Sequence, residues 1–147
     1  MVRRMVGKKN TAYLEHLRSV PLFSACTNKD LEKLAKAGDE ITVPAGHVIV
    51  DQGQMGREAF VVVAGSATVR RNGKKVATLG PGAVIGELSL LDHGPRTATV
   101  TTDTECTLFV LDQRHFAAVI DEVPAIGHKI MASLAAKIRE FDRQYFG

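Results

Sequence analysis

The sequence predicts an α+β fold in which helices flank a β-rich centre. Apolar residues recur at helical spacing before residue 40 and again after residue 112. Between these positions, short β-rich runs alternate with glycines, a pattern that is typical of a barrel, a sandwich or a roll. The length of 147 residues suits one domain with a substantial core.

The first ten residues are expected to form a flexible basic tail. They contain two pairs of basic residues but no apolar periodicity, so we predict a tail over 1–10 and one folded domain over 11–147. No apolar run reaches the roughly 20 residues that span a bilayer, and the N-terminus lacks the apolar core of a signal peptide. The expected location is therefore the cytoplasm, with no membrane contact.

Two short helices are predicted before the β-rich centre. Apolar residues three or four positions apart from 13 to 20 predict the first, which ends at Pro21. Thr27 is a candidate N-cap for the second helix, and Gly38 is placed to end it.

The β-rich centre contains seven candidate strands. Asn72-Gly73 predicts a tight hairpin between two of them, because both positions of such a turn must tolerate a positive φ angle. The basic residues on either side of this turn are interpreted as a solvated hairpin tip. The candidate strands are 41–43, 48–50, 59–64, 67–71, 75–79, 97–101 and 105–111.

Two further helices are predicted after the centre. Asp112 is placed to cap a helix that runs to about Glu122, and Pro124 suits the first turn of the last helix. The last helix carries one apolar stripe at spacings of three or four residues. Its members are Ile126, Ile130, Leu134, Ile138, Phe141 and Tyr145.

The segment from Gly86 to Ala98 contains the residues expected to bind a ligand. Gly86 lets a ligand approach the backbone, and the short helical turn that follows offers unpaired N–H groups to an anion. Arg96 adds a planar, permanently charged fork that suits two phosphate oxygens. Because a phosphate would repel the Glu87 carboxylate, we expect Glu87 to accept a hydrogen bond from a sugar hydroxyl.

This segment resembles the phosphate-binding cassette of the cyclic nucleotide-binding domain family, which includes the bacterial catabolite activator and the regulatory subunits of cyclic-nucleotide-dependent kinases. Gly-Glu-Leu-Ser-Leu at 86–90 and Arg-Thr-Ala at 96–98 have the spacing of that cassette. The resemblance covers about 12–146 and implies an eight-stranded antiparallel, jelly-roll-like β-roll. It also implies that Glu87 binds the ribose 2′-hydroxyl, while Arg96 and the backbone N–H groups near Ser89, Thr97 and Ala98 bind the cyclic phosphate. The implied ligand-binding residues are Gly86, Glu87, Leu88, Ser89, Arg96, Thr97 and Ala98.

The residues around the base are less determined by the resemblance. Val69 and Leu79 are candidates for the apolar side of a base pocket, although core packing is their default role. Phe141 and Asp142 occupy the positions of a Thr-Ser pair that contacts adenine in the catabolite activator. The last helix therefore has three interpretations: it packs on its own roll, forms a homodimer, or lays Phe141 over the bound base.

Three functional hypotheses follow. The first is a sensor of cyclic AMP, or less favourably cyclic GMP, that has no catalytic residue, metal or cofactor and regulates a partner through its last helix. The second is a protein-interaction module that keeps the fold without the ligand. The third, a cupin-like enzyme, lacks paired histidines for a metal.

The chain stops at Gly147, before the helix-turn-helix that follows this long helix in the catabolite activator, so no direct DNA binding is expected. A complete chain would act through a protein partner, and a fragment would have lost its output domain.

Overall fold

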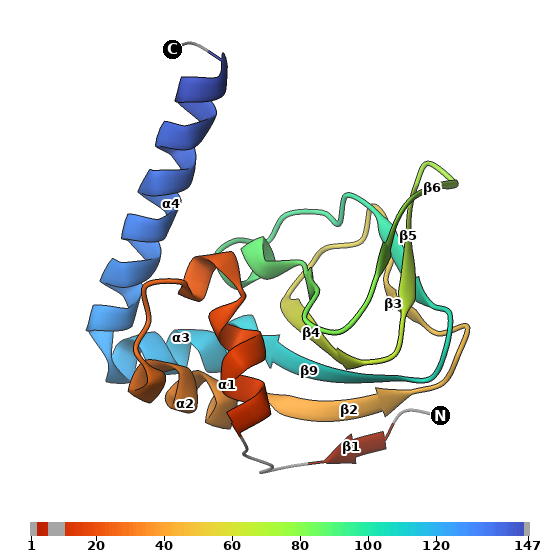
Figure 1. Cartoon of the computed structure of the whole chain (residues 1–147), viewed down its shortest axis with the longest axis horizontal. Coiled ribbons are helices and arrows are strands. Elements are labelled where there is room, and N and C mark those ends of the chain that lie inside the picture. Colours follow the sequence, from red (N-terminus) through yellow and green to blue (C-terminus); the bar gives the residue numbers. More distant parts are fainter. Residues whose placement is uncertain (1–2, 6–10, 146–147) are drawn as a thin grey trace.

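Two antiparallel sheets face each other, and helices cover the outer side of the larger sheet (Figure 1). The computed structural model describes residues 3–5 and 11–145. The larger sheet contains, in order across it, β1 (Arg3–Met5), β2 (Asp39–Val43), β9 (Cys106–Asp112), β4 (Glu58–Ala64) and β7 (Val84–Ile85). The smaller contains β3 (Val48–Val50), β8 (Thr99–Thr102), β5 (Ala67–Arg71) and β6 (Lys74–Leu79).

Strands β2 to β9 form the predicted β-roll, and all seven candidate strands are confirmed within two residues at their ends. Strand β7 has no counterpart among them because its two residues are too few to show a period of two. The predicted hairpin joins β5 to β6, with φ angles of 54° at Asn72 and 78° at Gly73.

Part of the expected N-terminal tail is a strand. Residues Arg3–Met5 form β1 and pair antiparallel with β2, with Arg4 opposite Ile41. The rest of the expected tail, 1–2 and 6–10, lies outside the described residues.

Strands β4 and β9 lie next to each other at the centre of the larger sheet and supply side chains to two cores. Because successive side chains of a strand point to opposite faces, Phe60 and Leu108 lie between the sheets, whereas Val61 and Phe109 face the helices. The roll therefore has an inner core, and a second core fixes the helices to its outer face.

The sequence predicts the first residues of α2 (Asn28–Ala37), α3 (Gln113–Glu122) and α4 (Pro124–Tyr145). Helix α1 (Thr11–Arg18) instead ends three residues before the expected end at Pro21. Thr27 caps α2 in a reciprocal capping box with Asp30, and the Asp112 side chain accepts a hydrogen bond from the His115 N–H to cap α3. The helices are α1 (Thr11–Arg18), the 3-10 helix η1 (Pro21–Phe23), α2 (Asn28–Ala37), the 3-10 helix η2 (Glu87–Leu90), α3 (Gln113–Glu122) and α4 (Pro124–Tyr145).

The Asp30 carboxylate joins two parts of the helical layer. It accepts hydrogen bonds from the Thr27 N–H at 3.0 Å and from the Lys129 ammonium of α4 at 2.5 Å. Burial raises the pKa of Asp30, but the hydrogen bonds from Lys129 and Thr27 outweigh it and hold this pKa below its usual value. The ionised form therefore stabilises the fold.

Replacing Asp30 with asparagine is expected to lower the free energy of unfolding by about 2 kcal/mol near neutral pH. Because the folded-state pKa is the lower one, this stabilisation is present above the unfolded pKa of about 3.9 and is lost as pH falls through the folded pKa. Urea unfolding at pH 7 and pH 3 measures both effects. Asp121→Asn, at an exposed position on α3, is the control, and an equal loss in the two variants would contradict the assignment.

The apolar stripe of α4 divides into two halves. Ile126 and Ile130 are buried against the other helices, whereas Ile138, Phe141 and Tyr145 are exposed. The C-terminal half of α4 extends beyond the rest of the molecule (Figure 1). Within the described part of the chain, no helix is both long enough and apolar enough to cross a bilayer.

Candidate functional site

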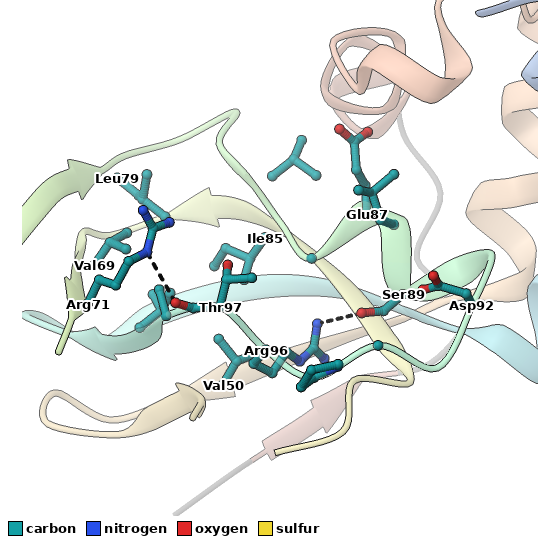
Figure 2. Close-up of a pocket in the computed structure, with 17 residues that line it drawn as sticks. Val50, Val69, Arg71, Leu79, Ile85, Glu87, Ser89, Asp92, Arg96 and Thr97 are labelled. Carbon is teal, nitrogen blue, oxygen red and sulfur yellow. Dashed lines mark hydrogen bonds between the residues drawn. The ribbon is translucent and has the colours of Figure 1, made fainter. Parts of the chain in front are cut away.

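A cavity of about 540 Å³ opens between strands of the roll and the cassette segment 86–98. This volume lies in the usual range for small-molecule sites. Apolar side chains from strands in both sheets form one wall, and the cassette forms the other (Figure 2). The lining residues are Val50, Val69, Arg71, Leu79, Val84, Ile85, Gly86, Glu87, Leu88, Ser89, Asp92, Gly94, Pro95, Arg96, Thr97, Ala98 and Val100.

The Arg96 guanidinium is held by uncharged partners. Its Nη1 donates to the Ser89 hydroxyl at 3.0 Å, and its Nη2 donates to the Glu58 carbonyl oxygen at 2.8 Å. Burial lowers the pKa of Arg96 and outweighs the Glu58 carboxylate, which acts in the opposite direction. A partly desolvated cation at the wall of a cavity attracts an anion, and its planar fork suits two oxygens of one phosphate.

Two glycines make room for this guanidinium. Gly86 has a φ angle of 70°, and a Cβ there would overlap Arg96 Nη1. A Cβ at Gly56 would overlap the Ser89 hydroxyl and lie 2.8 Å from Arg96 Cζ. Only glycine at both positions leaves the guanidinium its place, which gives Gly56 a role that the sequence alone did not predict.

The Glu87 carboxylate points away from Arg96 and towards the helical layer (Figure 2). Its Oε1 lies 3.6 Å from the Lys137 ammonium of α4, and its Oε2 accepts a long hydrogen bond of 3.4 Å from the Leu22 N–H. The expected separation of the Glu87 carboxylate from Arg96 is therefore present. Glu87 still lines the cavity, beside Leu88.

All seven predicted cassette residues and both predicted apolar residues, Val69 and Leu79, line this cavity. Phe141 and Asp142 do not line it, because they lie on the exposed C-terminal half of α4. The backbone N–H of Ser89 also differs from its predicted role, since it donates to the Gly86 carbonyl at 3.0 Å within η2. The Ser89 contribution to the site is its hydroxyl, which fixes Arg96.

Arg71 is one of the basic residues beside the Asn72-Gly73 turn, which the sequence predicts to be a solvated hairpin tip. It lines the cavity, and its Nε donates to the Thr97 carbonyl at 3.2 Å. The turn beside it is fixed by Gln52, whose amide exchanges two 2.9 Å hydrogen bonds with Asn72. This contact joins residues twenty positions apart, so no local sequence signal predicts it.

Comparisons with known proteins show the family to which this chain is related. The model of the family described as "Cyclic nucleotide-binding domain" matches residues 40–123. The chain is 33% identical over 141 residues to the Pycsar effector protein XpPycTIR of Xanthomonas perforans, a match that covers 95% of this chain and 46% of that protein. It is 29% identical over 131 residues to the Cyclic AMP receptor protein of Thermus thermophilus, covering 86% of this chain and 61% of that one.

A solved structure has the same fold over nearly its whole length. The N-terminal domain of a transcriptional regulator from Streptomyces coelicolor superposes with a TM-score of 0.82 at 30% identity, covering 89% of this chain and 94% of that domain. The chain thus spans about half the length of the curated relatives that it matches, and nearly all of an isolated domain.

Proposed function

The chain belongs to the cyclic nucleotide-binding domain family, and from this premise we propose that it is a sensor domain that binds one cyclic nucleotide in the cavity and does not alter it chemically. The observation that carries the proposal is Arg96, a partly desolvated cation whose hydrogen-bond partners among the described residues are both uncharged. An entering phosphate would supply the missing negative charge.

In the proposed complex, the cyclic phosphate lies on Arg96 and near the backbone N–H groups of Thr97 and Ala98. The ribose 2′-hydroxyl donates to Glu87, because an ionised carboxylate is a strong acceptor for an O–H group. The base lies against the apolar wall that includes Val69 and Leu79. The polar and apolar walls of the cavity therefore fit the two ends of a nucleotide.

Regulation is proposed to pass through α4. Its N-terminal half is packed on the domain, whereas its exposed C-terminal half is available to a partner or to a second copy of the chain. Ligand binding shifts a helix between two positions only if the protein binds the ligand more tightly with the helix in one position than in the other. Both curated relatives are longer than this chain, which supports output through a further domain or a separate partner protein, in the cytoplasm.

Cyclic AMP is the first candidate ligand, and the similarity to a protein named Cyclic AMP receptor supports it. Cyclic GMP is the second, and Arg71 favours it. The Arg71 guanidinium offers only donors, and guanine presents two acceptors, O6 and N7, where adenine presents one acceptor and a donor.

Replacing Arg71 with alanine is expected to reduce the affinity for cyclic GMP about fivefold or more, and to reduce the affinity for cyclic AMP less. Fluorescence competition with both nucleotides measures the ratio of the cyclic GMP affinity to the cyclic AMP affinity. Arg70→Ala is the matched control, because Arg70 is also exposed but does not line the cavity. An equal loss for both nucleotides would contradict a contact between Arg71 and the base edge.

Isothermal titration with cyclic AMP, cyclic GMP and linear 5′-AMP tests the proposal. We expect saturable binding of a cyclic nucleotide and weaker binding of 5′-AMP. A folded sample that binds neither cyclic nucleotide would favour the protein-interaction module, and the search for partners would then begin from α4.

A further inference from the structure

The Glu87 carboxylate lies at a junction between the cavity and the helical layer. Although Glu87 lines the cavity, its two oxygens contact the Lys137 ammonium and the Leu22 N–H, which both lie outside it. Figure 2 shows the Glu87 carboxylate turned away from Arg96. The Glu87 side chain is only 18% exposed, so its carboxylate is held largely by protein groups in this orientation.

Resting on the proposed function, we propose that Lys137 is a positioning residue that competes with the ligand's 2′-hydroxyl for the Glu87 carboxylate. A carboxylate accepts from only a few directions, and turning it towards a ribose in the cavity lengthens its contacts with Lys137 and Leu22. Ribose binding at Glu87 therefore weakens the ion pair between Glu87 and Lys137 of α4.

The competition works in both directions. A ligand that takes Glu87 weakens a contact of α4, and a partner that moves α4 frees Glu87 for the ligand, since coupling between two sites is reciprocal. A ligand without the 2′-hydroxyl leaves Glu87 with Lys137. Lys137 thereby sets how strongly the site distinguishes a ribonucleotide from its 2′-deoxy form, and the 2′-hydroxyl is the group that acts on α4.

The test compares the affinities for cyclic AMP and 2′-deoxy cyclic AMP (or the cyclic GMP pair if only cyclic GMP binds) in Lys137→Gln. Because the Lys137 side chain is half-exposed, the ion pair is modest, and we expect the ribonucleotide to bind about two- to fivefold more tightly. The 2′-deoxy form is expected to bind as it does to the unmodified protein.

Arg139→Gln is the matched control. It removes the same charge from an exposed position of the same helix, two residues away and hence on a different face. We expect it to leave both affinities unchanged, which separates the Glu87 contact from the general loss of positive charge. In a Glu87→Gln background, the Lys137 substitution is expected to have no further effect.

Three results would overturn the inference while leaving the proposed function intact: unchanged ribonucleotide affinity in Lys137→Gln, weaker affinity, or an equal gain for the 2′-deoxy form. Weaker affinity would mean that Lys137 holds Glu87 in place for the ligand. Failure of the unmodified chain to bind any cyclic nucleotide would overturn the proposed function and the inference together.

Discussion

Arg96→Ala is expected to weaken cyclic nucleotide binding by about 30-fold to several thousand-fold, which corresponds to about 2–5 kcal/mol. The phosphate would lose its only arginine partner in the cassette and would be left partly desolvated. The fold is expected to survive, because the cavity is open and water can reach the vacated partners, the Ser89 hydroxyl and the Glu58 carbonyl. Isothermal titration measures the loss, and circular dichroism checks the fold.

Two further variants locate the cause of this loss. Arg96→Lys keeps the charge but removes the planar fork, so we expect an affinity between those of the unmodified protein and Arg96→Ala. Arg70→Ala removes an exposed arginine outside the cavity and is expected to bind normally. If the Arg96→Ala affinity fell by less than a few-fold, Arg96 would not be the phosphate ligand.

Gly86→Ala is expected to reduce cyclic nucleotide affinity at least tenfold, or about 1.4 kcal/mol, although it removes no ligand contact. The added Cβ would overlap Arg96 Nη1, so the guanidinium must leave its place between Gly86 and Gly56. The positive φ angle at Gly86 also costs about 1 kcal/mol of stability in any variant with a side chain there.

Gly46→Ala is the control that separates displacement of the Arg96 guanidinium from the stability lost when a residue with a side chain has a positive φ angle. Gly46 has a similar φ angle, 78°, but a Cβ there would meet nothing within 4 Å. Both variants are expected to lose similar stability in urea unfolding, whereas only Gly86→Ala is expected to lose affinity. Equal affinities in the two variants would show that the close approach of Gly86 does not position Arg96.

The features that the sequence predicted well depend on residues adjacent in the chain. The Thr27 and Asp112 caps each act within three residues, and the Asn72-Gly73 turn joins consecutive strands. The cassette was recognisable for the same reason, because its glycine, glutamate and arginine lie within one short segment.

The features that the sequence did not predict depend on contacts between distant segments. Arg71 lines the cavity beside a turn that is hydrogen-bonded to Gln52, and a Cβ at Gly56 would overlap Arg96 from a distant part of the chain. The orientation of Glu87 depends on Lys137 of α4. The α4 stripe is regular in sequence, but periodicity does not say where a helix leaves the domain that buries its first half.

The most direct test of the central claim is a crystal structure of the chain with cyclic AMP bound. The account predicts phosphate oxygens roughly 2.7–3.2 Å from the Arg96 guanidinium nitrogens, the ribose 2′-hydroxyl on Glu87, and the base against Val69 and Leu79. A nucleotide bound elsewhere, or one whose phosphate does not contact Arg96, would contradict it.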